Sequence, residues 1–102
     1  IITGKMFGCG IYFAPSSYKS WGYTSYNGSR WARGSTNTAF MGLYSCAYGN
    51  PYYPTRSGEY KHIIKPPYNC LHATKQNTGL LNDEIVFYDE SAICLQYIVK
   101  FN

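Results

Sequence analysis

The chain has 102 residues, a length that allows one small domain with a modest hydrophobic core. Its formal net charge of +4 favours an anionic ligand such as a dinucleotide, but it is too small and too dispersed to indicate nucleic-acid binding by itself. No stretch reaches the length of a membrane span and none has the pattern of a secretory leader, so we expect no membrane partner. We expect an intracellular protein, nuclear or cytoplasmic.

Three glycines lie close together near the start of the chain, at Gly4, Gly8 and Gly10, just before the strand-like run Ile11–Phe13. Glycine tolerates positive φ and lets a ligand approach the main chain, so this cluster indicates a binding surface. The alternative is a glycine-rich turn beside a structural aromatic strand.

Two commoner glycine motifs do not fit this stretch. A phosphate-binding P-loop requires serine or threonine directly after its lysine, whereas Lys5 is followed by Met6. A dinucleotide fingerprint would need a third glycine at Phe13, on a turn that opens a helix.

The next segments predict one helix, one strand and much loop. Residues Pro15–Tyr23 are typical of a short helix that begins at a serine cap, Ser16 or Ser17. Residues 24–38 form a polar loop, and a strand follows over Thr38–Tyr48. Residues 51–78 hold four prolines, so we expect mostly irregular chain there, with a short strand over 62–64.

Two further strands are predicted near the end, over Leu80–Asp89 and Ile93–Phe101, because both runs are rich in β-branched and aromatic residues. Glu84 opens the first of them, at the lip of an apolar strand. Four main strands and one helix, besides the short strand over 62–64, indicate an α+β fold with a mainly antiparallel sheet.

Taken in order, these segments resemble the catalytic domain of poly(ADP-ribose) polymerase-type (PARP-like) ADP-ribosyltransferases. The resemblance covers residues 4–23 and 80–101 well and residues 41–50 more weakly, whereas residues 51–79 match only in being loop-like. It implies an antiparallel NAD-binding core with one short helix after the glycine-rich strand. It also implies that NAD is the substrate, that no metal takes part and that a protein or a nucleic acid accepts the ADP-ribose.

The resemblance also implies a nicotinamide pocket in the first part of the chain. Gly10 and Tyr12 belong to the family pattern Gly-x-Gly-Ile-Tyr-Phe-Ala, and Tyr12 and Tyr23 match its aromatic walls. Ser20 matches the hydroxyl that bonds the carboxamide, and Lys19 matches a lysine at the pocket edge. Taken singly, a strand tyrosine is usually core and a helix serine is usually solvated.

The catalytic residues implied by the resemblance are Tyr12 and Glu84, the last two members of the family triad His, Tyr, Glu. A carboxylate that accepts a hydrogen bond from the ribose 2′-OH stabilises positive charge on the sugar. We therefore expect Glu84 to fold back and face Tyr12 and Tyr23 across a slot sized for a flat pyridine ring.

The triad histidine has no counterpart, because His62 and His72 both follow Tyr12 in the chain. We expect each of them at a loop or a strand edge. The chain begins with Ile1 and only 14% of its residues are charged, so we interpret residues 1–102 as the C-terminal part of one ADP-ribosyltransferase domain. The N-terminal half, or another chain, would then be a partner.

Two other functions stay open. One is a catalytically inactive module that binds NAD or ADP-ribose, as the absent histidine would allow. The other is a nucleic-acid surface where basic and aromatic residues alternate, at Lys19, Trp21, Tyr26, Arg30, Trp31 and Arg33.

The four cysteines are too widely spaced for a zinc site: Cys9, Cys46, Cys70 and Cys94. Two disulfides are the alternative, but we expect buried free thiols in an intracellular protein.

Overall fold

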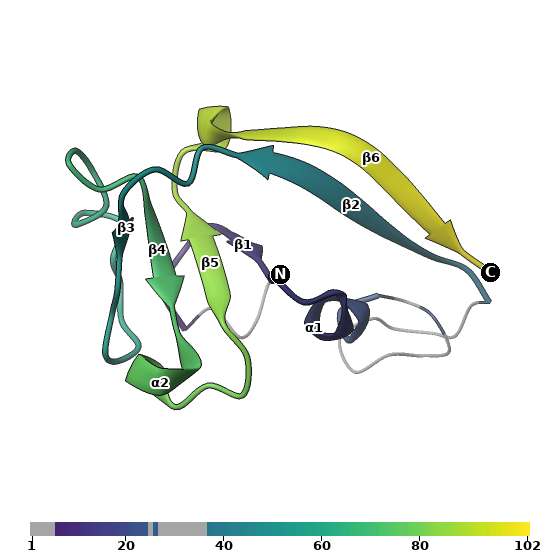
Figure 1. Cartoon of the computed structure of the whole chain (residues 1–102), viewed down its shortest axis with the longest axis horizontal. Coiled ribbons are helices and arrows are strands. Elements are labelled where there is room, and N and C mark those ends of the chain that lie inside the picture. The colour runs from purple at the N-terminus through teal and green to yellow at the C-terminus, as the bar shows by residue number, and fades with distance from the viewer. Residues whose placement is uncertain (1–5, 25, 27–36) are drawn as a thin grey trace. The chain divides into compact units, whose positions relative to one another are not determined.

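A computed structural model describes residues 6–24, 26 and 37–102 of the chain (Figure 1). The chain divides into two compact units. The first unit comprises Ile1–Pro15 and Cys46–Ile93, and the second comprises Ser16–Ser45 and Cys94–Asn102.

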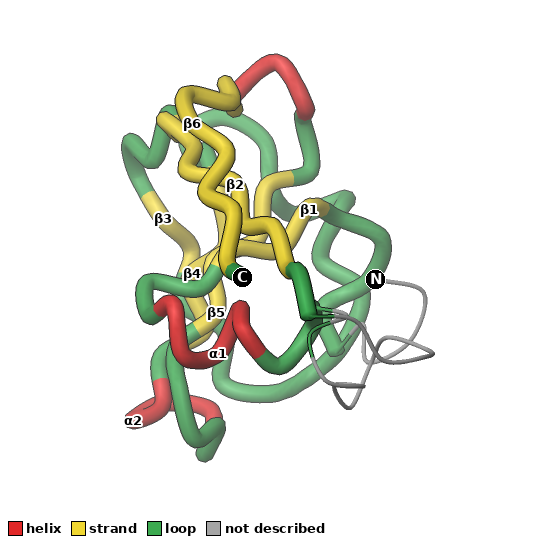
Figure 2. Tube along the Cα trace, turned by 90° about the vertical axis from the view of Figure 1, so that its right-hand side faces the viewer, coloured by secondary structure: helices red, strands yellow, loops and turns green. Residues whose placement is uncertain are grey.

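The first unit contains a four-stranded sheet in the order β1-β5-β4-β3. Its strands are β1 (Ile11–Phe13), β3 (Pro51–Tyr52), β4 (Cys70–Ala73) and β5 (Glu84–Phe87). Strand β5 is antiparallel to both β1 and β4, whereas β3 is parallel to β4. The short helix α2 (Lys75–Thr78) and the 3-10 helix η1 (Glu90–Ala92) precede and follow β5, and loops make most of the other connections (Figure 2).

One face of this sheet carries the hydrophobic core. The side chains of Phe7, Leu71, Ala73 and Val86 are fully buried there, and partly buried side chains pack against them: Tyr12, Tyr52, Tyr60, Ile64, Leu80 and Tyr88. Since side chains alternate along a strand, the register pairs Leu71–Val86 and Tyr12–Val86 place β1, β4 and β5 side chains on this common face.

The second unit contains helix α1 (Ser17–Trp21) and all but one residue of each strand in a two-stranded sheet, β2 (Ala39–Cys46) and β6 (Ile93–Phe101). The two strands run in opposite directions (Figure 1). Trp21 of α1 packs edge-to-face against Phe101 of β6, with ring centroids 5.3 Å apart. This aromatic contact ties the helix to the sheet within the unit.

The α+β class and the mainly antiparallel pairing confirm the sequence prediction. The helix within Pro15–Tyr23 and the strand within Thr38–Tyr48 are present with shorter bounds. The loop predicted over 24–38 lies mostly outside the described residues. No helix in the described part of the chain is long and apolar enough to cross a bilayer.

One prediction about residues 51–78 was wrong. The strand expected over 62–64 is a turn, in which the amides of Ile63 and Ile64 both donate to the Tyr60 carbonyl. The segment is mostly irregular, as expected, but it also contains β3, β4 and α2. Strand β4 lacks β-branched residues and forms because β3 and β5 pair with it on either side, which no local pattern reveals.

Candidate functional site

Tyr12 and Glu84 lie on the same face of the sheet in the first unit. Tyr12 pairs with Val86 across β1 and β5, and Glu84 lies two residues before Val86 on the same strand. Strand alternation therefore directs Glu84 and Tyr12 to one face, as diagonal neighbours. The pKa of the Tyr12 hydroxyl is raised by its burial and, among smaller causes, by the negative charge of Glu84.

Glu84 is enclosed at the first position of β5. Only 8% of the residue is exposed, its Oε2 atom is buried, and it is the one charged residue in the buried class among those the structure describes. A glutamate at a solvent-facing strand edge would be far more exposed. Charges in such an environment act strongly on neighbouring groups because little water screens them.

The Tyr12 hydroxyl closes the glycine-rich turn that precedes β1. It donates a hydrogen bond to the Gly8 carbonyl at 2.8 Å and accepts one from the Phe7 amide at 3.0 Å. The Tyr88 hydroxyl donates to the Phe7 carbonyl. Tyr12 and Tyr88 thus both bind the turn. The Tyr12 hydroxyl is hydrogen-bonded within the first unit.

Gly8 and Gly10 allow other groups to come close to the main chain. In the structure these groups are side chains of the first unit. A Cβ on Gly10 would lie 2.5 Å from Val86 Cγ1 and 3.0 Å from the Tyr88 ring. Gly8 has φ of +84°, and a Cβ there would lie 2.2 Å from the Glu59 carboxylate oxygens. Gly10 is therefore required for packing against Val86 and Tyr88, whereas Gly8 is required by its positive φ.

The other predicted pocket residues belong to the second unit. Lys19 and Ser20 lie on α1, and Tyr23 follows it, with the Tyr23 amide donating to the Ser20 carbonyl at 3.0 Å. Ser16 occupies the N-cap position, as expected, although its side chain makes no capping hydrogen bond. The structure places Tyr12 and Glu84 on one face of the sheet, whereas Gly10 lies against Val86 and Tyr88. The slot that would also include Lys19, Ser20 and Tyr23 stays a prediction.

Half of the suggested nucleic-acid surface lies outside the described residues, namely Arg30, Trp31 and Arg33. Of the remainder, Trp21 and Tyr26 pack on each other with ring centroids 5.0 Å apart. Because Trp21 also packs on Phe101, part of its ring surface is engaged within the second unit.

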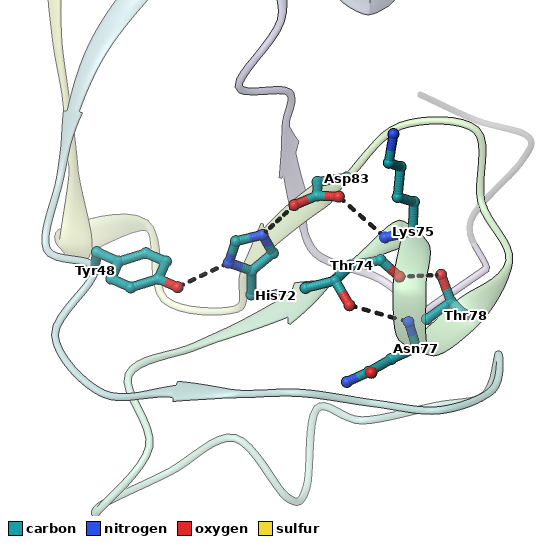
Figure 3. A network of polar contacts seen from close by, with 7 residues as sticks. All are labelled: Tyr48, His72, Thr74, Lys75, Asn77, Thr78 and Asp83. Atoms are coloured by element: carbon teal, nitrogen blue, oxygen red, sulfur yellow. Dashed lines mark hydrogen bonds and ion pairs between the residues drawn. The ribbon is translucent and has the colours of Figure 1, made fainter.

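A polar network in the first unit was not anticipated from the sequence (Figure 3). His72 Nδ1 lies 2.7 Å from the Tyr48 hydroxyl, and His72 Nε2 lies 2.8 Å from Asp83 Oδ2. Asp83 Oδ1 accepts a hydrogen bond from the Lys75 amide at 3.0 Å. This amide and His72 lower the pKa of Asp83, whereas burial is the main cause that raises the pKa of Tyr48.

The two histidines lie in a turn and on a strand. His62 is in a turn, as expected, and His72 lies on β4, where it pairs with Ile85 of β5 but lies beyond the two residues of β4 that pair with β3. The one local signal for a special role was the acidic pair Asp83-Glu84 at the start of an apolar strand. The sequence could not identify His72 as the partner of Asp83, because only the pairing of β4 with β5 brings these two residues together.

The cysteines differ in burial, which the sequence prediction missed. Cys70 is buried, Cys46 is half-buried, and Cys9 and Cys94 are exposed. Burial is the main cause that raises the pKa of the Cys70 thiol to about 11. Within the described ranges, no three His, Cys, Asp or Glu side chains gather in a way that could hold a metal ion.

Comparison with known proteins supports a distant relationship. No protein-family model matches the chain. The chain is similar to poly(ADP-ribose) polymerase-like 100L of Invertebrate iridescent virus 6, with 29% identity over 105 residues, covering 95% of this chain and 52% of the viral protein. The chain thus spans about half the length of that relative. Because the match covers 95% of the chain, it spans the positions of both Tyr12 and Glu84. The chain is thus similar, at low identity, to a PARP-like protein.

Proposed function

We propose that the chain forms part of an enzyme that transfers ADP-ribose from NAD to an acceptor and releases nicotinamide. The observation that carries the proposal is the placement of Glu84 and Tyr12 on one face of the sheet, from the two segments that resemble the family most. The similarity to a PARP-like viral protein supports it.

The reaction breaks the bond between the nicotinamide nitrogen and C1 of its ribose. The bonding electron pair leaves with nicotinamide, which becomes neutral, and positive charge develops on the sugar. An acceptor oxygen or nitrogen then forms a bond to C1 and gives up its proton to water or to a basic group. Such a transition state needs electrostatic stabilisation and orientation more than covalent help.

In this proposal Glu84 is the catalytic carboxylate. It accepts a hydrogen bond from the ribose 2′-OH and stabilises the developing positive charge. Its burial favours this role, since a preorganised charge acts more strongly where water is excluded. A protein side chain is the proposed acceptor, and a nucleic-acid end is the second choice.

Tyr12 would act through its ring, as a wall for nicotinamide, while its hydroxyl maintains the turn at Phe7 and Gly8. Tyr23 keeps the aromatic role that the resemblance implies. Ser20 would bond the carboxamide, and Lys19 would lie at the edge near the phosphates. The contact to the adenine-side ribose would come from polypeptide that precedes this segment or from another chain.

The test measures the transfer of labelled ADP-ribose from NAD by the full-length protein that contains this segment. We expect Glu84→Gln to lower the rate by roughly 100- to 1,000-fold, because it removes the charge while keeping the side-chain shape. The control is Glu90→Gln, the same change at an exposed glutamate of η1, which should keep the wild-type rate. Equal rates for Glu84→Gln and the wild-type protein would overturn the assignment.

A module that binds NAD without turnover is the second candidate. Both ring nitrogens of His72 are engaged, with Tyr48 and with Asp83, so this histidine does not replace the missing triad member. Calorimetric titration with NAD, combined with analysis of released nicotinamide, separates the two functions. Binding by the full-length protein without nicotinamide release would favour the module.

A further inference from the structure

We infer that Tyr48, His72 and Asp83 are positioning residues that hold the backbone beside Glu84, so that the Glu84 carboxylate keeps one orientation. The inference rests on the proposed function of Glu84. The inference goes beyond that function because it assigns a role to the polar network of Tyr48, His72 and Asp83 (Figure 3). His72 and Asp83 lie on the sheet face opposite to the Glu84 side chain.

The place of Glu84 at the end of a strand pair explains why such support is needed. Ala73 and Glu84 form the last register pair between β4 and β5, since β4 ends at Ala73 and β5 begins at Glu84. Beyond this pair no ladder holds the chain, and strand ends open more easily than strand centres. A catalytic group at such an end needs another constraint, because a displacement of about 1 Å can cost about 100-fold in rate.

Asp83 supplies that constraint from the position directly before Glu84. Its two carboxylate oxygens are bound separately, Oδ2 by His72 Nε2 at 2.8 Å and Oδ1 by the Lys75 amide at 3.0 Å. One bond comes from β4 and the other from the first residue of α2, so the carboxylate spans the end of the ladder. His72 pairs with Ile85, the neighbour of Glu84 on the other side, which places the anchor on the face opposite to the Glu84 side chain.

The ionised Asp83 carboxylate fixes the direction of one hydrogen bond in the network. A carboxylate can only accept, so His72 Nε2 carries the hydrogen that is donated to Asp83. On the other side of the ring, Nδ1 and the Tyr48 hydroxyl form a hydrogen bond across 2.7 Å, in which Tyr48 is the donor whenever the ring is neutral. The ring is further confined by Tyr53, which packs against it with centroids 5.7 Å apart. The imidazole is thus held at both nitrogens and along one side.

The turn that carries the second anchor is itself well braced. The Asn77 amide donates to Thr74 Oγ1 at 3.2 Å, and the Thr78 hydroxyl donates to the Thr74 carbonyl at 2.7 Å (Figure 3). The helix ends at Gly79 in the left-handed conformation, with φ of +77°. The Lys75 amide therefore occupies a defined position, and its hydrogen bond to Asp83 holds the residue directly before β5 in place.

The kinetic test uses single variants in the full-length protein. We expect His72→Ala and Asp83→Ala to lower kcat for NAD turnover by roughly 10- to 100-fold, with KM for NAD within about 2-fold, because orientation of Glu84 matters most in the transition state. His72→Gln keeps an amide donor near the Nε2 position and should recover most of kcat. If the loss of kcat only reflected lower stability, His72→Gln and His72→Ala would have the same kcat when their stabilities are equal. That result would contradict the positioning role.

Asp89 offers a matched control at the other end of β5. Its carboxylate also binds two groups, the Ser91 amide at 3.0 Å and the Ser91 hydroxyl at 2.8 Å. Asp89→Ala removes as many hydrogen bonds as Asp83→Ala but leaves the neighbourhood of Glu84 intact, so kcat should stay at the wild-type value. Equal loss of kcat in both variants would overturn the positioning role.

A second measurement is independent of turnover. Hydrogen–deuterium exchange of peptides that cover residues 82–87 should be faster in His72→Ala than in the wild-type protein, and close to wild type in His72→Gln. An inactive wild-type protein would refute the proposed function, while the exchange rates would still decide whether the network holds this strand end. Unchanged exchange in His72→Ala would overturn the inference in either case.

Discussion

The Tyr12 hydroxyl binds the Gly8 carbonyl and the Phe7 amide, so the central tyrosine of the candidate site is also the residue that fixes the glycine-rich turn. Tyr12 reaches this turn from the same sheet face that carries Glu84. Tyr12 therefore both holds the glycine-rich turn and belongs to the candidate site. A conservative substitution can separate these two roles.

Tyr12→Phe should reduce the free energy of unfolding by about 1–3 kcal/mol, because it leaves a partly buried amide and carbonyl without their hydroxyl partner. Denaturation in urea would measure the change. Tyr18→Phe is the control, since Tyr18 is 81% exposed, and it should leave the free energy of unfolding unchanged. Identical unfolding midpoints for Tyr12→Phe and Tyr18→Phe would show that the turn does not depend on this hydroxyl.

Gly10→Ala should lower the free energy of unfolding by about 1–3 kcal/mol, because the added methyl group would overlap Val86 Cγ1 at 2.5 Å and crowd the Tyr88 ring. Thermal or chemical denaturation would record the loss. At Gly22 a Cβ would make only ordinary contact, 3.5 Å from the Lys19 carbonyl oxygen, and φ is −62°. Gly22→Ala should therefore be neutral or slightly stabilising, and a similar loss in both variants would contradict the packing argument.

Acid should destabilise the first unit partly through Asp83. The pKa of this carboxyl is lowered from its usual 3.8 by the Lys75 amide and by His72, so its contribution to stability is present above the unfolded-state pKa and disappears as pH falls through the folded-state pKa. Unfolding free energies measured between pH 6 and pH 2 should fall less steeply below about pH 4 in Asp83→Asn than in the wild-type protein. Parallel curves for the two proteins would exclude a linkage through Asp83.

Thiol labelling should follow burial. Cys9 and Cys94 are exposed, whereas Cys70 is buried and has a pKa raised to about 11, so little of it is thiolate near neutral pH. Treatment with iodoacetamide at about pH 8, followed by mass spectrometry, should modify Cys9 and Cys94 first and Cys70 only after unfolding. Early modification of Cys70 in the folded protein would show that its strand is open to reagent.

The local part of the fold was readable in the amino-acid sequence. The apolar and aromatic runs predicted strands where β2, β5 and β6 lie, and the serine-rich start of residues 15–23 predicted α1, because these signals act within a window of several residues. Glu84 was placed correctly at the opening of its strand. These features depend on residue type and spacing alone.

Tertiary structure decided everything that depends on pairing between distant segments. It directed β5 and β6, which are neighbours in the chain, into different sheets, and it made β4 an internal strand without a local β signal. It also brought His72 to Asp83 and Tyr12 to the face of Glu84. Register and burial arise from contacts that form only when the strands meet, so no single stretch of sequence contains them.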